Sequence, residues 1–476
     1  MIPFGPFRPD VAAINAQVCT LAKNCVPIAR GYGPLRSLVA ATSALPTACV
    51  GAAVVLANDG AVSHYAGTAN QIYKLNSVAT WGAYGAGGYS VPAGDRWTFT
   101  TFGNDTLATN ITDGLQMSSG SAFAPVGGAP RGRYLTTVRD FVFMGSIFGN
   151  EGRVQWSSLG NATGWVPGSG ESDYQDARSG GPVRGVIGGE VGYLLQAQRV
   201  TRMVYVPGSE TIFQFDEVEG ARGIIAPHSL VQVGRTAWYQ SQDGLYEFDT
   251  ASGSSKPIGV GKWAEWFAKD VRRSSEFLTV GSADPVNKRI LWVYVPTSSI
   301  NNTPIRGLLY DWSLDDATIV DVSAEAGVQW LTQGVTLDTM DSFGTLETLP
   351  FSLDSAFWRG GAGILGTFTT DHKLSLFDGT NAAATWETAD GQTDTRTHIT
   401  GTRPQIDGTG VTVAVGMRER DGDTIAYGPQ EALEDTGTVP AHASGNYARA
   451  RVETTAGANW TAMKGLKTEA KRMGKR

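Results

Sequence analysis

Paired carboxylates are the residues of this chain that could carry acid–base chemistry. Asp315 with Asp316 forms one pair, and Asp338 with Asp341 forms another. Glycoside hydrolysis uses two carboxyl groups held at a fixed separation across a sugar. Whether either pair converges in that way depends on the fold, so a glycosidase is kept only as an alternative function.

Cysteines and histidines are the next candidates, because both bind metals and both act in catalysis. The three cysteines, Cys19, Cys25 and Cys49, are odd in number, and no second cluster supplies zinc-ligand spacing. We expect three reduced, partly buried thiols. The histidines are scattered, and none stands at helical spacing from a carboxylate pair. They are His64, His228, His372, His398 and His442.

Motifs for nucleotides and activated nucleophiles are missing. Gly261-Lys262 has no Ser or Thr after it and no Gly at the required upstream spacing, so it is not a Walker loop. Neither Gly-x-Ser-x-Gly nor His-Glu-x-x-His occurs. Asp105, Asp113 and the pair Asp390 with Asp394 could bind calcium in a loop, but they lack EF-hand spacing. We therefore predict no catalytic site, no cofactor and no metal.

Basic residues gather at the C-terminus, where one acid, Glu469, interrupts them. Such a segment is either a solvated terminus or a contact for DNA phosphates or an acidic partner surface. The candidate contact residues are Lys464, Lys467, Lys471, Arg472, Lys475 and Arg476.

Composition predicts an all-β protein. The 476 residues include 60 glycines, aromatics make up 10%, and charged residues only 17%. Gly and Pro mark turns, whereas aromatic and β-branched residues suit strands. The net charge of −7 argues against a protein that grips nucleic acid through its phosphates, but it allows one that lets DNA pass. No apolar run of about 18 residues occurs, so we expect no membrane span.

The elements that would position these residues are hairpins. About seven hairpin-bearing units of roughly 40 to 50 residues follow one another, which is typical of a β-propeller. Asp-Gly turns such as Asp59-Gly60, Asp243-Gly244 and Asp378-Gly379 join strands. We expect a propeller of about six to eight blades and keep sandwiches or a barrel as the alternative.

Four segments follow from this pattern. Residues 1–45 are expected to be an irregular leader, 46–387 a propeller platform, 388–463 a small β-sandwich-like module, and 464–476 a basic tail. The stretch from Asp390 to Asp394 is expected to be a linker. Lys262 to Val271 predicts one short amphipathic helix whose aromatics pack on the β scaffold.

The order of several short motifs resembles the phage packaged-DNA stabilisation proteins, also called short-tail nozzle or tail hub proteins. The similarity spans residues 6–378 and, more loosely, the C-terminal module. The matching positions are Pro9-Asp10, Asn24, Val26-Pro27, Gly31 to Pro34, Phe102 to Asp105, Ala108, Asn110, Ala129-Pro130, Arg139 to Phe141, Val154 to Ser157, Trp165, Gly223 to Ser229 and Ser241 to Gly244.

The resemblance implies a structural virion protein rather than an enzyme. Members of that family form a ring, usually of six copies, below the portal and adaptor. The ring continues the DNA channel, retains packaged DNA, conducts it during ejection, and supports fibres, spikes or a plug. Partners would be the adaptor ring, those appendages and genomic double-stranded DNA. The protein would be made in the host cytoplasm and reside in the phage tail.

Two alternatives remain at this point. One is a tail protein that binds a host receptor or glycan. The other is a propeller glycosidase, although Ser241-Gln242-Asp243-Gly244 departs from the repeated Ser-x-Asp-x-Gly box of sialidases because its Gly comes one position early and it occurs once. We expect the N-terminal stretch to be tied down, closing a blade or crossing to a neighbour.

Overall fold

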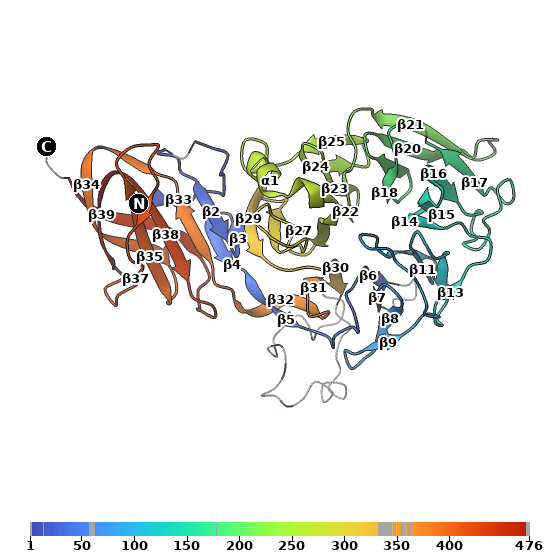
Figure 1. The fold of residues 1–476 in the computed structure, drawn as a ribbon, viewed down its shortest axis with the longest axis horizontal. Helices are drawn as coiled ribbons and strands as arrows, with labels where there is room; N and C mark the ends of the chain where they lie inside the picture. The colour runs from blue at the N-terminus through green and yellow to red at the C-terminus, as the bar shows by residue number, and fades with distance from the viewer. Residues whose placement is uncertain are drawn as a thin grey trace.

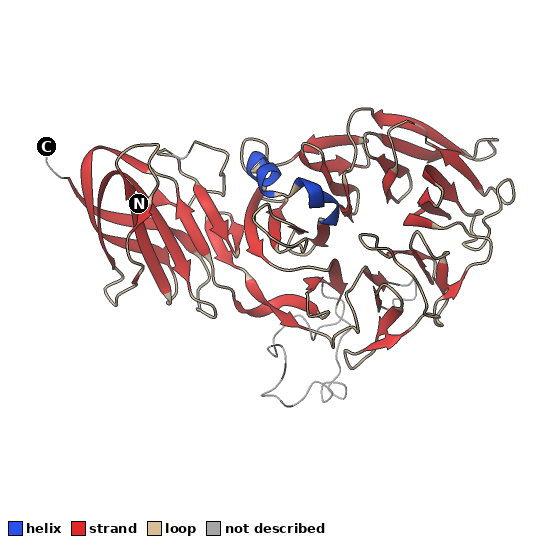
Figure 2. Ribbon diagram, in the orientation of Figure 1, coloured by secondary structure: helices blue, strands red, loops and turns tan. Residues whose placement is uncertain are grey.

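The regular structure of the chain is almost entirely β-strand, in a disc-like ring beside a smaller elongated unit (Figures 1 and 2). The computed structural model describes residues 2–472, except residues 13, 57–61 and 178 and most of 332–362, where only 345, 349, 351, 353 and 358 are described. The expected all-β propeller with a small C-terminal β module is confirmed.

Four-stranded units form the ring, each strand antiparallel to the next. Along the chain, the first three are β6 (Ala52–Leu56), β7 (Val62–Gly67), β8 (Ile72–Leu75) and β9 (Trp81–Ala83); β10 (Thr98–Phe102), β11 (Asp105–Thr109), β12 (Gln116–Ser118) and β13 (Ala124–Pro125); and β14 (Gly132–Val138), β15 (Phe141–Ile147), β16 (Asn150–Trp156) and β17 (Asp173–Asp176). The next two are β18 (Val183–Ile187), β19 (Gly192–Gln196), β20 (Val200–Tyr205) and β21 (Phe213–Glu219); and β22 (Ala226–Val233), β23 (Thr236–Ser241), β24 (Gly244–Asp249) and β25 (Ser254–Pro257).

Two further units complete the ring. They are β26 (Val280–Asp284), β27 (Arg289–Tyr294), β28 (Arg306–Asp311) and β29 (Asp316–Asp321); and β30 (Ala326–Leu331), β31 (Gly363–Phe368), β32 (Leu374–Asn381) and β5 (Arg36–Ala40). Six of these seven units are separate sheets, and the unit β26–β29 belongs to a larger one. The first strands of successive units contact one another, and β30 contacts β6, so the ring is closed.

The N-terminus closes the last blade. Strand β5 pairs with β32, with Val39 opposite Leu376 and Leu38 opposite Phe377. The expectation that the N-terminal stretch is tied down is thus confirmed. Because one strand of the blade comes from the start of the chain, the ring cannot open without breaking this pairing.

Apolar side chains fill the spaces between blades, as the alternating strand patterns require. Phe143, Trp156 and Phe213 pack with ring centroids 4.8 to 5.4 Å apart in one such layer. Of the expected Asp-Gly turns, Asp243-Gly244 forms one: Gly244 has φ +144° where β23 turns into β24. Asp378-Gly379 does not, because both residues lie within β32, where the pairing with β5 shifts register. Asp59-Gly60 lies outside the described residues.

A short helix, α1 (Ala264–Asp270), forms where the sequence predicts it, followed by the 3-10 turn η1 (Arg273–Leu278). Trp263 and Phe267 are buried in the largest apolar cluster, as expected. The carboxylate of Asp10 accepts hydrogen bonds of 2.8 Å from the backbone N–H groups of Glu265 and Trp266. A residue near the start of the chain therefore satisfies free N–H groups at the helix start.

The second unit is built from both ends of the chain. Its strands are β1 (Ile2–Pro3), β2 (Cys19–Lys23), β3 (Cys25–Ile28), β4 (Gly31–Pro34), β33 (Thr385–Thr388), β34 (Gly391–Ile406), β35 (Val411–Arg418), β36 (Ala426–Tyr427), β37 (Glu431–Ala432), β38 (Val439–Thr454) and β39 (Met463–Arg472). The long strands β34 and β38 pair with each other, and Ile399, Val415 and Ala441 form a small apolar cluster between the layers.

Three of the expected segments need correction. Residues 1–45 are not irregular, because β1, β2, β4 and β5 pair with strands several hundred residues away and β3 pairs with β4. The expected linker from Asp390 runs into β34 instead, with Asp390 buried between two arginines. The expected tail is strand β39 as far as Arg472, paired along most of its length with β34. In each case a distant partner strand supplies the hydrogen bonds.

The two units share one sheet. Strand β2 pairs with β33 on one side and with β29 of the propeller on the other. Asn24, with φ +54°, donates to the carbonyl of Ala383 at 3.1 Å and accepts from the N–H of Asp321 at 2.8 Å. The backbone therefore continues across the joint as paired β-structure rather than as a free linker.

Candidate functional site

The described blades line a partly open cavity of about 260 Å³ on the axis of the propeller. Each of the seven blades lends part of its first strand or the residues just before it to the wall. A second cavity of about 300 Å³ adjoins it, and the two share Ala52, Leu230 and Gly281. Together they occupy the region where the first strands converge.

Small residues keep this space open. Gly185, Gly281 and Gly327 lie in the wall. A Cβ at Gly185 would stand 3.1 Å from the Leu230 side chain, and one at Gly281 would stand 2.5 Å from Val231. Larger side chains here would force the first strands apart, so the converging strands carry Gly and Ala at these positions.

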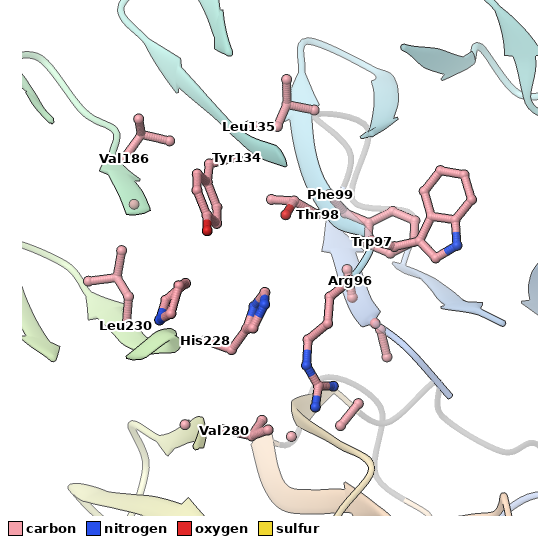
Figure 3. Close-up of a pocket in the computed structure, with 18 residues that line it drawn as sticks. Arg96, Trp97, Thr98, Phe99, Tyr134, Leu135, Val186, His228, Leu230 and Val280 are labelled. Atoms are coloured by element: carbon pink, nitrogen blue, oxygen red, sulfur yellow. The ribbon is translucent and has the colours of Figure 1, made fainter. Parts of the chain in front are cut away.

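Three polar side chains reach the cavity from three different blades (Figure 3). Arg96 precedes β10, Tyr134 lies in β14, and His228 lies in β22. Burial raises the pKa of Tyr134, and it lowers the pKa of His228 well below 6.5, an effect that the Arg96 charge strengthens. At neutral pH the imidazole is uncharged and the phenol is protonated, so both carry a hydrogen that can be donated.

Arg96 is the charged residue of this wall. Its Nη1 donates a hydrogen bond of 2.5 Å to the backbone carbonyl of Glu325, and burial lowers its pKa. None of the described residues that line either cavity is an Asp, a Glu or a Lys. The Glu325 carboxylate lies near enough to favour the charged guanidinium, but its oxygens accept from the Cys49 N–H at 2.9 Å and bond His372 Nδ1 at 2.7 Å.

The acids considered for catalysis are placed differently. Asp315 lies in the turn between β28 and β29, where it pairs with Lys262 at 2.5 Å and accepts from the Tyr310 hydroxyl at 3.0 Å. Asp316 follows it, and burial raises its pKa. The pair thus lies in a hairpin turn, away from the axial cavity. Asp338 and Asp341 lie outside the described residues.

Asp243 of the sialidase-like stretch and Asp113 of a candidate calcium loop form hydrogen bonds to nearby residues. Asp243 accepts a hydrogen bond of 2.6 Å from the Tyr246 hydroxyl within the β23–β24 hairpin. Asp113 accepts from the N–H of Ser90 and from the Asn110 amide. Among the described residues, no group of three or more His, Cys, Asp or Glu side chains could hold a metal ion.

The three cysteines lie deeper than expected. Cys19, Cys25 and Cys49 are free thiols and fully buried. Burial raises the pKa of Cys19 and of Cys49 to about 12, so these thiols are not poised as nucleophiles at neutral pH.

The basic residues of the C-terminus are held in order by β39. The side chains of Lys464, Lys467, Lys471 and Arg472 are exposed, and none has an ion-pair partner among the described residues. Glu469, the acid among them, pairs with Arg403 at 3.0 Å. Lys475 and Arg476 lie outside the described residues.

Sequence reasoning did not find the axial site. His228 lies in a motif of the resemblance, but nothing in the sequence singled out Arg96 or Tyr134. These residues are far apart along the chain, and only the closure of the ring brings them to one axis. A usable signal was their shared position at the start of the first strand of a blade.

No known protein family and no curated protein matches the chain. Among solved structures, the extracellular domain of a protein described as a one-component system from B. thetaiotaomicron is 10% identical, with a TM-score of 0.41 over 85% of this chain; this chain spans 47% of that domain. Virginiamycin B lyase from Staphylococcus aureus is 10% identical, with a TM-score of 0.41, over 69% of this chain and 94% of the lyase.

The WD40 domain of Pan2 from Neurospora crassa is 8% identical, with a TM-score of 0.37, over 68% of this chain and 87% of that domain. Similarities this low carry no argument about activity. The chain's own topology, a closed ring of four-stranded blades, defines it as a β-propeller protein. Among the described helices, none has the length and apolar character that crossing a membrane would require.

Proposed function

We propose that this chain is a structural subunit of a bacteriophage tail nozzle, which assembles into a ring below the portal and adaptor. The observation that carries the proposal is the position of the residues that resemble the phage family. Asp10 binds the start of α1, and Asn24 bonds both the propeller and the C-terminal module. Val26 packs against Leu291 and Leu309 of the propeller unit that continues into the module.

The resembling N-terminal motif therefore lies at the joint of the two units. A subunit that bears load within a tail needs such a joint, since a flexible linker would let the propeller and the module move independently. The shared sheet through β29, β2 and β33 supports the same role. The proposal assigns the chain no catalysis.

The proposal places the DNA path between subunits. The axial cavity of about 260 Å³ is in the size range of small-molecule sites, and its wall side chains block the axis to a duplex. A ring of six chains, each at −7, would carry a formal charge of about −42, which suits a conduit that does not hold DNA by its phosphates.

The exposed basic face of β39 would then bind the adaptor ring, and Lys467 and Lys471 are its central residues. They lie on the same face of the strand, opposite Arg403 and His398 of β34. Positive charge gathered on one strand of a chain that is acidic overall suits an acidic partner surface.

Mixing the purified protein with the adaptor ring of its phage tests the proposal. We expect a complex of several copies per ring, visible by mass photometry and negative-stain microscopy. The double variant Lys467→Glu, Lys471→Glu should weaken it by at least about tenfold, whereas Lys256→Glu together with Arg235→Glu, which reverses two charges on the propeller, should leave it intact. A protein that stays monomeric with every adaptor preparation would contradict the proposal.

A further inference from the structure

We propose that the axial cavity binds a small organic oxyanion, a carboxylate or a phosphate ester, through Arg96, with Tyr134 and His228 as further donors. This inference goes beyond the nozzle function and does not depend on it. It rests on one guanidinium group that borders a cavity whose lining, among the described residues, holds no carboxylate.

The position of Arg96 in the wall of the axial cavity is the first argument. A guanidinium has five N–H donors. Among the described residues, the Arg96 side chain donates to one acceptor, the carbonyl of Glu325. Because no carboxylate lines either cavity among the described residues, the remaining donors have no protein acceptor of opposite charge. An anion in the cavity would supply one.

Other arginines of this chain show what a structural arginine looks like here. Arg153 pairs with Asp176 at 2.6 Å, and Arg306 pairs with Asp270 at 2.6 Å. Arg418 and Arg449 both pair with the buried Asp390, at 2.5 and 2.7 Å. These arginines are satisfied by a carboxylate that the fold brings to them. Arg96 differs from them, although it lies at the convergence of the seven blades.

The second argument is the convergence of neutral donors. The Tyr134 side chain points into the space that Arg96 and His228 also border (Figure 3). No hydrogen bond of the Tyr134 hydroxyl to another described residue is present, although burial keeps it protonated. A hydroxyl, an imidazole N–H and a guanidinium that border one cavity are donors of the kinds that bind the oxygens of a carboxylate or phosphate group.

The other residues of the cavity wall indicate what the rest of the ligand contacts. Val186, Leu230 and Val280 give the cavity apolar sides, and the adjoining space of about 300 Å³ is lined mainly by Gly, Ala, Val and Leu. Sites for small molecules are mostly apolar with a few placed polar groups. The ligand class is thus a small anion whose remaining atoms contact these small side chains and the backbone.

Titration calorimetry on the purified full chain tests the inference, with sodium benzoate and inorganic phosphate as probes and sodium chloride at matched ionic strength as the blank. We expect saturable binding of one molecule per chain for at least one probe. Binding of benzoate alone identifies a carboxylate site, and binding of phosphate alone identifies a phosphate site. No saturable binding of either probe at millimolar concentration would overturn the inference.

Variants locate the site. Arg96→Gln should weaken binding at least about tenfold, because a charge-assisted hydrogen bond is lost, and Tyr134→Phe should weaken it several-fold. Arg235→Gln removes the same charge from an exposed hairpin and should change nothing. If Arg96→Gln fails to fold, Arg96→Lys and Tyr134→Phe decide instead. Wild-type affinity in folded variants at both positions would place the bound anion elsewhere and refute the proposed site.

Discussion

The guanidinium of Arg96 and the backbone carbonyl of Glu325 are joined by a hydrogen bond of 2.5 Å between residues 229 positions apart. This bond connects the start of the second blade to the start of the last. The Glu325 carboxylate extends the link, because it accepts from the Cys49 N–H and bonds His372 of the β31–β32 turn. Glu325 thus connects the residues before the first blade, the start of the second blade and a turn of the last blade.

Replacing Glu325 should loosen this closure. Glu325→Ala removes the acceptor for the buried Cys49 N–H and the partner of His372, and we expect the free energy of unfolding to fall by about 1 to 3 kcal/mol. Urea denaturation measures the change. Glu210→Ala, at an exposed loop residue, is the control and should cost little. Equal stability of the two variants would show that the Glu325 contacts contribute nothing.

The pH dependence of stability should report on His64. Burial lowers its pKa from 6.5 to about 4, although the hydrogen bond to the Leu331 carbonyl acts the other way. The folded pKa lies below the unfolded one, so this contribution to stability is present above pH 6.5 and is lost as the pH falls toward 4. The full loss is about 3 kcal/mol.

His64→Phe should flatten this part of the profile, because a phenyl ring does not titrate. The measurement is urea denaturation at several values between pH 4 and 7 for both proteins. The wild type should lose more stability than the variant over that range. If the stability of the two proteins changed equally with pH, His64 would have the same pKa in the folded and unfolded chains.

The helix contact of Asp10 should be a measurable part of the joint. Asp10→Ala leaves the N–H groups of Glu265 and Trp266 without their acceptor, and we expect a loss of about 0.5 to 2 kcal/mol, as for other residues that satisfy helix starts. Thermal unfolding measures it, with Asp140→Ala at an exposed turn as the control. A melting temperature equal to that of the control would show that the Asp10 contact does not stabilise the protein.

Strand β5 should hold the last blade in place. Leu38 packs against the apolar cluster that contains Leu291 and Leu309. Leu38→Asp puts a charge there, and we expect a loss of about 2 kcal/mol or more together with faster proteolysis of the N-terminus. Arg36→Ala, on the same strand but exposed, should be much milder. Resistance to protease equal to that of the wild type would show that the blade stays closed without this contact.

Local features were predictable from the sequence, and distant pairings were not. The hairpin at Asp243-Gly244 and the helix around Trp266 depend on neighbours in the chain, so turn chemistry and apolar spacing sufficed. The strand that contains Lys467 was expected to be a tail because its many cations obscure the strand pattern. It forms a strand because its backbone pairs with β34. Asp390 looked like part of a linker because the arginines that bury it lie 28 and 59 residues further on.

The axial site shows the same limit more sharply. Arg96, Tyr134 and His228 have no spacing in common, and their meeting depends on the closure of a ring whose last strand comes from residues 36–40. The lack of a carboxylate in the described lining of the cavity becomes visible only once all seven inner strands are placed.

Electron cryo-microscopy of particles purified from the phage that encodes this protein tests the central proposal most directly. The account predicts a closed ring of propeller subunits below the portal and adaptor, with the DNA path between subunits, the axis of each propeller blocked by its own side chains, and β39 facing the adaptor. Purified particles that lack this protein, or a tail in which it occurs as an isolated monomer, would contradict the account.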